Sequence, residues 1–114
     1  MRGLVRSVVM ARHVRDYAVR TVLATHPDSE HAPESVRRFV RHGASPRGVQ
    51  SLVLAAKAQA LFNERLNVSF EDIQHAAAAA LRHRILLNFE GEAQGVATTA
   101  LIEEILGELE VAPA

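Results

Sequence analysis

The sequence contains no cysteine and few aromatic residues, and it has no long apolar run. Without cysteine, disulfide bonds and thiolate metal sites are excluded. Aromatic residues make up 4% of the chain, which leaves little for stacking on nucleic-acid bases. No run approaches the roughly 20 apolar residues of a membrane span, and no apolar signal segment follows Arg2 and Arg6. We therefore expect a cytoplasmic protein that has no membrane partner.

The residues that perform ATP chemistry by themselves are also missing. There is no Gly-x-x-x-x-Gly-Lys-Ser/Thr loop to hold a triphosphate, and no aspartate-rich strand end to hold magnesium. Histidines occur at positions 13, 26, 31, 42, 75 and 83, and no two of them form the His-x-x-x-His pair of a helical metal site. We expect no metal site, and no ATPase activity from the chain alone.

Positive and negative charges balance overall but are unevenly distributed along the chain. Residues 1–50 hold nine arginines and four acidic residues, whereas residues 85–114 hold six glutamates and no lysine or arginine. This distribution predicts one basic and one acidic face. The basic face could meet nucleic acid, a neighbouring copy or another part of a larger protein, or both faces could simply be solvated.

The apolar pattern predicts a single all-α domain over residues 1–114, a small bundle of about four to five helices. The chain has 114 residues and is 48% hydrophobic, which suits one compact core. Apolar residues recur at helical spacing, and no convincing strand is visible. The predicted helices cover about residues 11–25, 34–41, 46–65, 69–84 and 98–110.

The helix predicted over residues 46–65 is apolar on two faces, so we expect it to be buried between other helices. One face carries Val49, Leu52, Val53, Ala56 and Ala60, and the other carries Leu54, Ala58, Leu61 and Phe62. The first helix has one inner face, formed by Val14, Tyr17, Ala18, Thr21 and Val22.

Local signals set the predicted helix ends. Ser69 and Asp72 have the spacing of a capping box, and Gly43 is expected to cap the C-terminus of the helix over residues 34–41. Three further predictions concern the last third of the chain: an extended connector at residues 85–89, a loop between Gly91 and Gly95, and a cap by Thr98 or Thr99 on the last helix.

The run Ser45-Pro46-Arg47 is the best candidate for a functional site. Ser45 is suited to cap the helix, and Pro46 fits its first position. Arg47 would then lie where helix N–H groups and the helix dipole already favour an anion, and a guanidinium there can bind phosphate oxygens with paired bonds. The same three residues are also a common helix start with a solvated arginine.

The chain resembles the C-terminal lid domain of MoxR-type AAA+ ATPases, relatives of the magnesium-chelatase ATPase subunit, from about Val5 to Leu109. The motifs that carry the resemblance are Tyr17-Ala18-Val19-Arg20, Ala24-Thr25, His42 to Gly48, Ala55 to Ala58, Val68 to Ile73, Leu81-Arg82-His83-Arg84-Ile85 and Glu90 to Ala93. The sequence departs from the family at His26, where an arginine is usual, and at the Asn63–Asn67 loop, where Gly-Arg-Asp is usual.

The resemblance implies a nucleotide-sensing role. It makes Arg47 the sensor 2 residue, supported by Ser45 and Pro46. In the family this arginine reaches the γ-phosphate of ATP, and an N-terminal core domain holds the ATP with Mg. The resemblance places Tyr17 on the adenine side. It also implies contact with neighbouring subunits of a chaperone-like ring, and a partner with a von Willebrand A domain. For His83 and Arg84 it suggests either a structural role or a subunit contact, and we favour structure.

Two other kinds of protein fit parts of the sequence. The arginine-rich first half, with two short helices before Gly43, could form a small nucleic-acid-binding module. The low aromatic content and the zero net charge count against that. A plain helical interaction domain would differ from the lid only in having no phosphate-facing role for Arg47.

Overall fold

The structure is a computed structural model, and it describes residues 8–109. It confirms the predicted all-α domain and adds a two-stranded sheet. The described residues extend over 42 × 29 × 20 Å. The elements are α2 (Arg12–Leu23), α3 (Glu34–Phe39), β1 (Val40–His42), α4 (Pro46–Phe62), α5 (Phe70–Leu81), β2 (Leu86–Leu87), α6 (Phe89–Ala93) and α7 (Thr98–Glu108).

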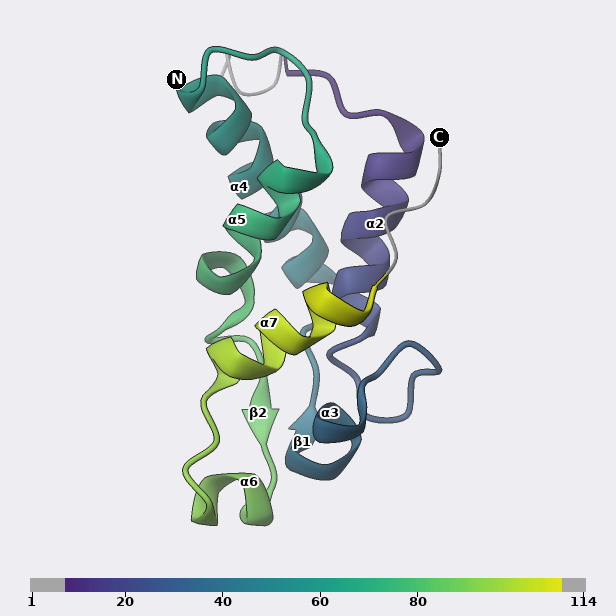
Figure 1. Cartoon of the computed structure of the whole chain (residues 1–114), viewed down its shortest axis with the longest axis vertical. Coiled ribbons are helices and arrows are strands. Elements are labelled where there is room, and N and C mark those ends of the chain that lie inside the picture. The colour runs from purple at the N-terminus through teal and green to yellow at the C-terminus, as the bar shows by residue number, and fades with distance from the viewer. Residues whose placement is uncertain (1–7, 110–114) are drawn as a thin grey trace.

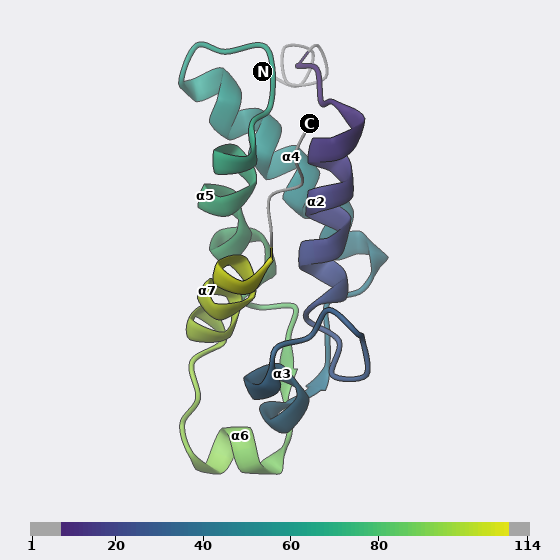
Figure 2. The same ribbon diagram turned by 45° about the vertical axis from the view of Figure 1, so that its right-hand side comes forward.

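The domain has two parts along its long axis. Helices α2, α4 and α5 lie side by side in the upper part, and α7 lies across α5 (Figures 1 and 2). The lower part consists of α3, α6 and the small sheet, with α3 packed on α6 (Figure 1). At the upper end, the N–H of Val9 donates to the carbonyl of Leu66 at 2.7 Å, and Val68 donates back to Val9 at 2.9 Å. The segment before α2 is therefore fixed to the loop before α5.

Helix α4 is the centre of the core, because it packs on both α2 and α5. Its inner face is completely buried at Leu52, Ala56 and Ala60. Alanine at two of these positions lets the neighbouring helices approach closely. The inner face predicted for α2 is also confirmed, and all five of its residues are buried.

The second apolar face predicted for α4 is not buried. Leu54 is 60% exposed and Phe62 is 85% exposed, while Leu61 is half-buried. The prediction of burial on both sides was wrong because, within residues 8–109, the helices that cover α4 lie on its inner side. One flank of α4 is therefore free to line a surface site.

The structure also corrects the prediction that the domain has no strand. The helix predicted over residues 34–41 ends at Phe39, and β1 pairs antiparallel with β2, with Val40 opposite Leu87. The connector predicted at residues 85–89 thus finds its partner in residues that we had assigned to a helix end. Gly43 does not cap α3, because Val40 is the C-cap residue.

Two predictions near the end of the chain were wrong as well. The first part of the loop predicted between Gly91 and Gly95 belongs to helix α6, which Asn88 caps by accepting a 2.8 Å bond from the N–H of Gly91. The N-cap of α7 is Ala97, so neither threonine caps that helix. The hydroxyl of Thr98 instead donates to the carbonyl of Arg82 at 2.9 Å and fixes the start of α7 to the end of α5.

The capping box predicted at the start of α5 is confirmed, and its buried carboxylate forms an ion pair with the partly exposed side chain of Arg65. Asp72 is 1% exposed and accepts bonds from Arg65 at 2.6 and 3.0 Å and from the N–H of Ser69 at 2.8 Å. Burial of the carboxyl raises its pKa, but the bonds from Arg65 and Ser69 outweigh that effect, so the pKa of Asp72 lies below its ordinary value.

We expect Leu52→Ala to lower the free energy of unfolding by about 2–5 kcal/mol, because it leaves a cavity in the middle of the core. The matched control is Leu54→Ala on the exposed flank of α4, where the change should stay within about 0.5 kcal/mol. Urea unfolding of both variants measures the difference. Equal effects at the two positions would show that α4 is not oriented as described.

The Asp72→Asn variant should be less stable than wild type by about 1–3 kcal/mol at neutral pH, because the buried carboxylate and its charged bonds are lost. The pKa of Asp72 is lowered on folding, so its contribution is complete above its unfolded pKa and disappears as the pH falls through the folded pKa. The stability gap should therefore close in acid. Glu71→Gln, at an exposed neighbouring position, is the control, and a gap that is independent of pH would contradict this account.

Candidate functional site

The candidate arginine lies at the beginning of α4, as predicted. Ser45 is the N-cap residue, Pro46 is the first helical residue, and the Ser45 hydroxyl accepts a 3.2 Å bond from the N–H of Arg47. The Arg47 side chain is exposed, and its guanidinium makes no hydrogen bond or ion pair to any of residues 8–109. All of its donors are therefore available to a ligand.

The turn that follows α2 holds Ala44, the residue before the N-cap of this helix, by both of its backbone groups. The N–H of Ala44 donates to Thr25 Oγ1 at 2.9 Å, and its carbonyl accepts from His26 Nε2 at 2.7 Å. Thr25 Oγ1 in turn donates to the carbonyl of Val22 at 2.6 Å. We call the contacts of Ala44 with Thr25 and His26 the Ala44 clamp. It fixes the start of α4, and with it Arg47, relative to α2.

Gly43 makes the Ala44 clamp possible. A Cβ atom at this position would lie 2.6 Å from the backbone carbonyl group of Thr25. Any side chain there would push the segment away from α2 and lengthen both bonds to Ala44. The close approach explains the glycine, which the sequence alone had suggested as a helix cap.

Arg47 opens onto a surface hollow of about 360 Å³ on the exposed flank of α4. The hollow is lined by Arg47, Gln50, Ser51, Leu54 and Arg84. Arg84 follows the end of α5, so two elements far apart in sequence each contribute an arginine to the lining of one hollow. No carboxylate lies among the described residues that line the hollow. Sequence reasoning did not find this pairing, because it depends on how α5 packs on α4.

A second hollow, of about 210 Å³, lies beside the first between α2 and α4. Its lining is largely apolar and consists of Arg15, Val19, Val49, Gln50 and Val53. Gln50 lines both hollows. An apolar surface and a cationic surface therefore adjoin each other across α4.

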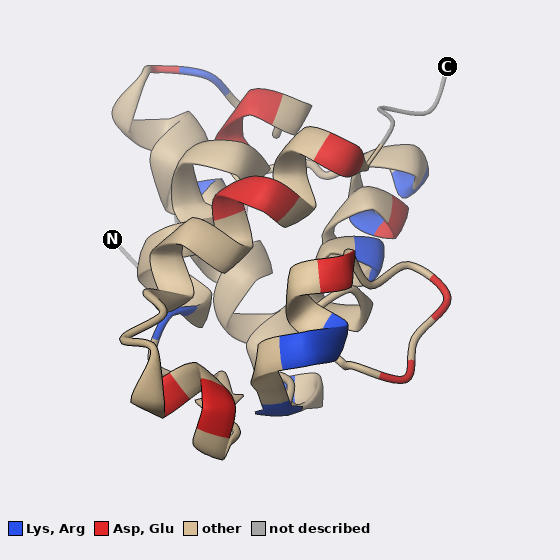
Figure 3. Ribbon diagram, turned by 60° about the horizontal axis from the view of Figure 1, so that its bottom comes forward, with Lys and Arg blue, Asp and Glu red and all other residues tan. Residues whose placement is uncertain are grey.

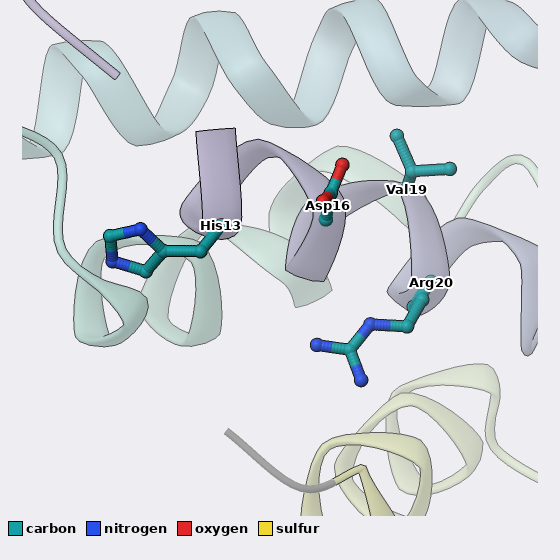
Figure 4. A pocket seen from close by; sticks show the side chains of 4 residues that line it. All are labelled: His13, Asp16, Val19 and Arg20. Carbon is teal, nitrogen blue, oxygen red and sulfur yellow. The ribbon is translucent and has the colours of Figure 1, made fainter. Parts of the chain in front are cut away.

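Tyr17, which was predicted on the adenine side, lies in the core. Its side chain is fully buried, meets Phe70 edge-on at 5.2 Å, and accepts a 3.3 Å bond from Gln74 at its hydroxyl. A hollow above it on α2 is lined by its neighbours His13, Asp16, Val19 and Arg20, whose side chains point outward in different directions (Figure 4). Contact between Tyr17 itself and a nucleotide stays a prediction.

Within residues 8–109 no three histidine or acidic side chains come together as metal ligands, and none of the helices there is long and apolar enough to cross a membrane.

The arginine-rich first part of the chain and its glutamate-rich last part are in contact. Arg38 on α3 binds Glu90 on α6 at 2.9 Å, so the basic and acidic segments adjoin at this end (Figure 3). The predicted separation into two faces fails here.

We expect Thr25→Val to lower the free energy of unfolding by about 1–3 kcal/mol, because it leaves the buried N–H of Ala44 without an acceptor. The control is Thr21→Val, also buried, whose hydroxyl only donates to the carbonyl of Tyr17 within the same helix at 2.8 Å. Hydrogen exchange of the Ala44 amide should accelerate in the first variant only. Unchanged exchange would show that the bond does not protect this amide.

Comparison with known proteins identifies the family. The family described as the AAA lid domain matches residues 33–105. The Bacillus subtilis protein YeaC, which is uncharacterized, is 35% identical over 98 residues, covering 82% of this chain and 31% of that protein. Chaperone MoxR1 of Mycobacterium tuberculosis is 32% identical over 91 residues, covering 80% of this chain and 24% of that protein.

A solved structure agrees with these relatives. The crystal structure of a putative ATPase from Cytophaga hutchinsonii matches 98% of this chain with a TM-score of 0.92 and 36% identity. The chain covers 34% of that protein, so it spans about a third or less of the proteins it resembles. The match includes the start of α4 and the end of α5, which together form the cationic hollow. The chain belongs to the AAA lid domains, and among them to those of the MoxR-type AAA+ ATPases.

Proposed function

We propose that Arg47 is the sensor 2 residue of a MoxR-type AAA+ ATPase and that this domain closes on bound nucleotide. The observation that carries the proposal is the Arg47 side chain, whose guanidinium has no partner among residues 8–109. Arg47 lies in the first turn of α4, and the Ala44 clamp fixes the backbone at the start of that helix. Arginine in such a position can bind phosphate oxygens with paired, charge-assisted bonds. A triphosphate on a facing domain would draw Arg47 toward it, and loss of the γ-phosphate would release it.

The groups around Arg47 fit phosphate and do not fit magnesium. The hollow offers two guanidinium groups, the hydroxyl of Ser51 and the amide of Gln50, which are donors for phosphate oxygens. Magnesium prefers carboxylate oxygens, and none lines the hollow among the described residues. Mg·ATP supplies the transferable phosphoryl group, and its metal would be held by the core domain. The role of Arg47 is to neutralise charge on that phosphate and to orient the lid.

The apolar hollow between α2 and α4 supports a nucleotide that lies across α4. Val19, Val49 and Val53 present aliphatic surface next to the cationic hollow. A base could rest on this surface while the phosphates reach Arg47. Tyr17 would then support the adenine side from beneath, through the packing of α2, while its ring stays in the core.

For the whole protein we propose an ATP-driven, chaperone-like ring. The support is the family and the name of one relative, Chaperone MoxR1. In such a ring the domain would contact its own N-terminal core domain and a neighbouring subunit. A protein with a von Willebrand A domain is the proposed partner, by the same family resemblance.

In a protein that joins this domain to its P-loop core, Arg47→Ala should reduce ATP turnover by at least about tenfold, because arginines that reach the transferred phosphoryl group contribute strongly to rate. The same substitution in the 114-residue chain should change the free energy of unfolding by less than about 1 kcal/mol, since Arg47 is exposed. ATP hydrolysis assays and urea unfolding measure the two effects.

Arg12→Ala is the matched control, because Arg12 is exposed and lies at the beginning of α2. It removes the same charge and should leave turnover unchanged. Normal turnover in the Arg47 variant would remove the sensor role. Large destabilisation of the isolated domain would instead make Arg47 a structural residue.

A further inference from the structure

We propose that Arg84 is a second phosphate-binding residue, which binds the same polyphosphate as Arg47. The proposal rests on the proposed function of Arg47 and adds a residue for which the sequence had favoured a structural role. Both side chains line the hollow on the exposed flank of α4, one from each side of the contact between α4 and α5. The ligand that fits is a nucleoside polyphosphate, recognised through its phosphate chain.

The backbone holds Arg84 close to the start of α4. Its N–H donates to the carbonyl of Leu81 at 2.9 Å, in the turn that ends α5. Across from this turn, α4 has Gly48, where a Cβ atom would lie 2.9 Å from Cβ of Ala44 and 3.3 Å from Cδ2 of Leu81. The absence of a side chain at Gly48 lets the end of α5 pack closely on the start of α4. Cδ of Arg84 lies at ordinary contact distance from the same position, 3.8 Å, and Arg84 lines the hollow together with Arg47.

A structural role does not account for the Arg84 side chain. Arg84 is exposed, and its guanidinium has no hydrogen bond or ion pair with any of residues 8–109. Other arginines do have such roles: Arg65 binds Asp72 at 2.6 Å, and Arg38 binds Glu90 at 2.9 Å. Arg84 therefore keeps its donors for something outside the described domain.

The electrostatics of the hollow favour an anion with several charges. Two cations at one site repel each other, and no carboxylate among the described lining residues compensates them. A polyphosphate neutralises both charges, and it offers oxygens to both guanidinium groups at once. A single phosphate would satisfy one arginine, whereas a di- or triphosphate is long enough to reach both. Ser51 and Gln50 can donate further neutral bonds to the same chain.

The test is a nuclear magnetic resonance titration of the 114-residue chain with inorganic tripolyphosphate at low salt, following backbone amides and arginine Nε–H signals. We expect saturable shifts around the start of α4 and the end of α5. Arg84→Ala and Arg47→Ala should each weaken binding by about fivefold, the upper range for one exposed charge contact. Arg84→Lys keeps the charge but lacks the paired N–H donors of the guanidinium, so it should bind more tightly than Arg84→Ala and less tightly than the wild type.

Arg82→Ala is the matched control, because it removes the same charge two residues away, from an exposed side chain that does not line the hollow. It should reduce affinity by less than about twofold, since only screened, long-range attraction is lost. Equal losses in the Arg82 and Arg84 variants would overturn the proposal by showing attraction without a site. So would unchanged affinity in Arg84→Ala together with weaker self-association, which would make Arg84 a subunit contact.

The outcomes separate this inference from the role of Arg47. Loss of binding in Arg47→Ala with normal binding in Arg84→Ala would retain the sensor and reject the second arginine. An absence of saturable shifts in the wild-type chain would reject the two-arginine site. The ATP turnover of the Arg47 variant in a full-length protein would still decide the sensor role on its own.

Discussion

The position of the candidate site depends on how the turn after α2 holds one residue, Ala44. The N–H of Ala44 donates a hydrogen bond to Thr25 and its carbonyl accepts one from His26, so both of its backbone groups are used by side chains eighteen or nineteen positions earlier. Both bonds require that the chain pass directly against α2 at Gly43. The first turn of α4 follows at once. Its orientation is set by the core through these bonds, not by the exposed residues of the site.

The burial of α4 on one side completes this arrangement. Its inner face supplies a large part of the core, through Leu52 and the alanines that allow close helix contact. Its other flank carries an exposed leucine and the polar residues of the cationic hollow. The inner face and the flank are therefore separate surfaces of one helix. Substitutions on the flank would test the proposed ligand binding while the inner face keeps the fold intact.

Most of the fold could be predicted from the sequence, because its signals are local. The inner face of α2, the N-cap Ser45 and the capping box of Ser69 and Asp72 depend on residues a few positions apart. The small sheet could not be predicted in this way, since its strands have three and two residues and pair across more than forty positions. Periodicity carries no information at that length.

Local sequence determines the residues of the candidate site to different extents. The position of Arg47 in the first turn of α4 could be predicted because its neighbours define a helix start. Arg84 lines the same hollow only through the packing of α5 on α4, and Gly48, which lets Leu81 approach α4 closely, resembles any other glycine in the sequence. For Tyr17, local sequence predicted burial in the core, whereas the family resemblance suggested a place beside the nucleotide. Its helical spacing correctly predicted burial, and burial is what keeps its ring away from the surface.

The attachment of the segment before α2 gives the domain the geometry of a lever. Val9 is fixed to Leu66 and Val68 at the upper end, next to the loop that follows the C-terminus of α4. Arg47 lies at the opposite end of that helix, and the 17 residues of α4 at 1.5 Å per residue place it about 25 Å away. A rigid rotation of about 10° about the upper end would displace Arg47 by about 4 Å, which exceeds the length of a hydrogen bond. If Arg47 has the proposed sensor role, small changes of angle there are sufficient to make or break its contact with a phosphate.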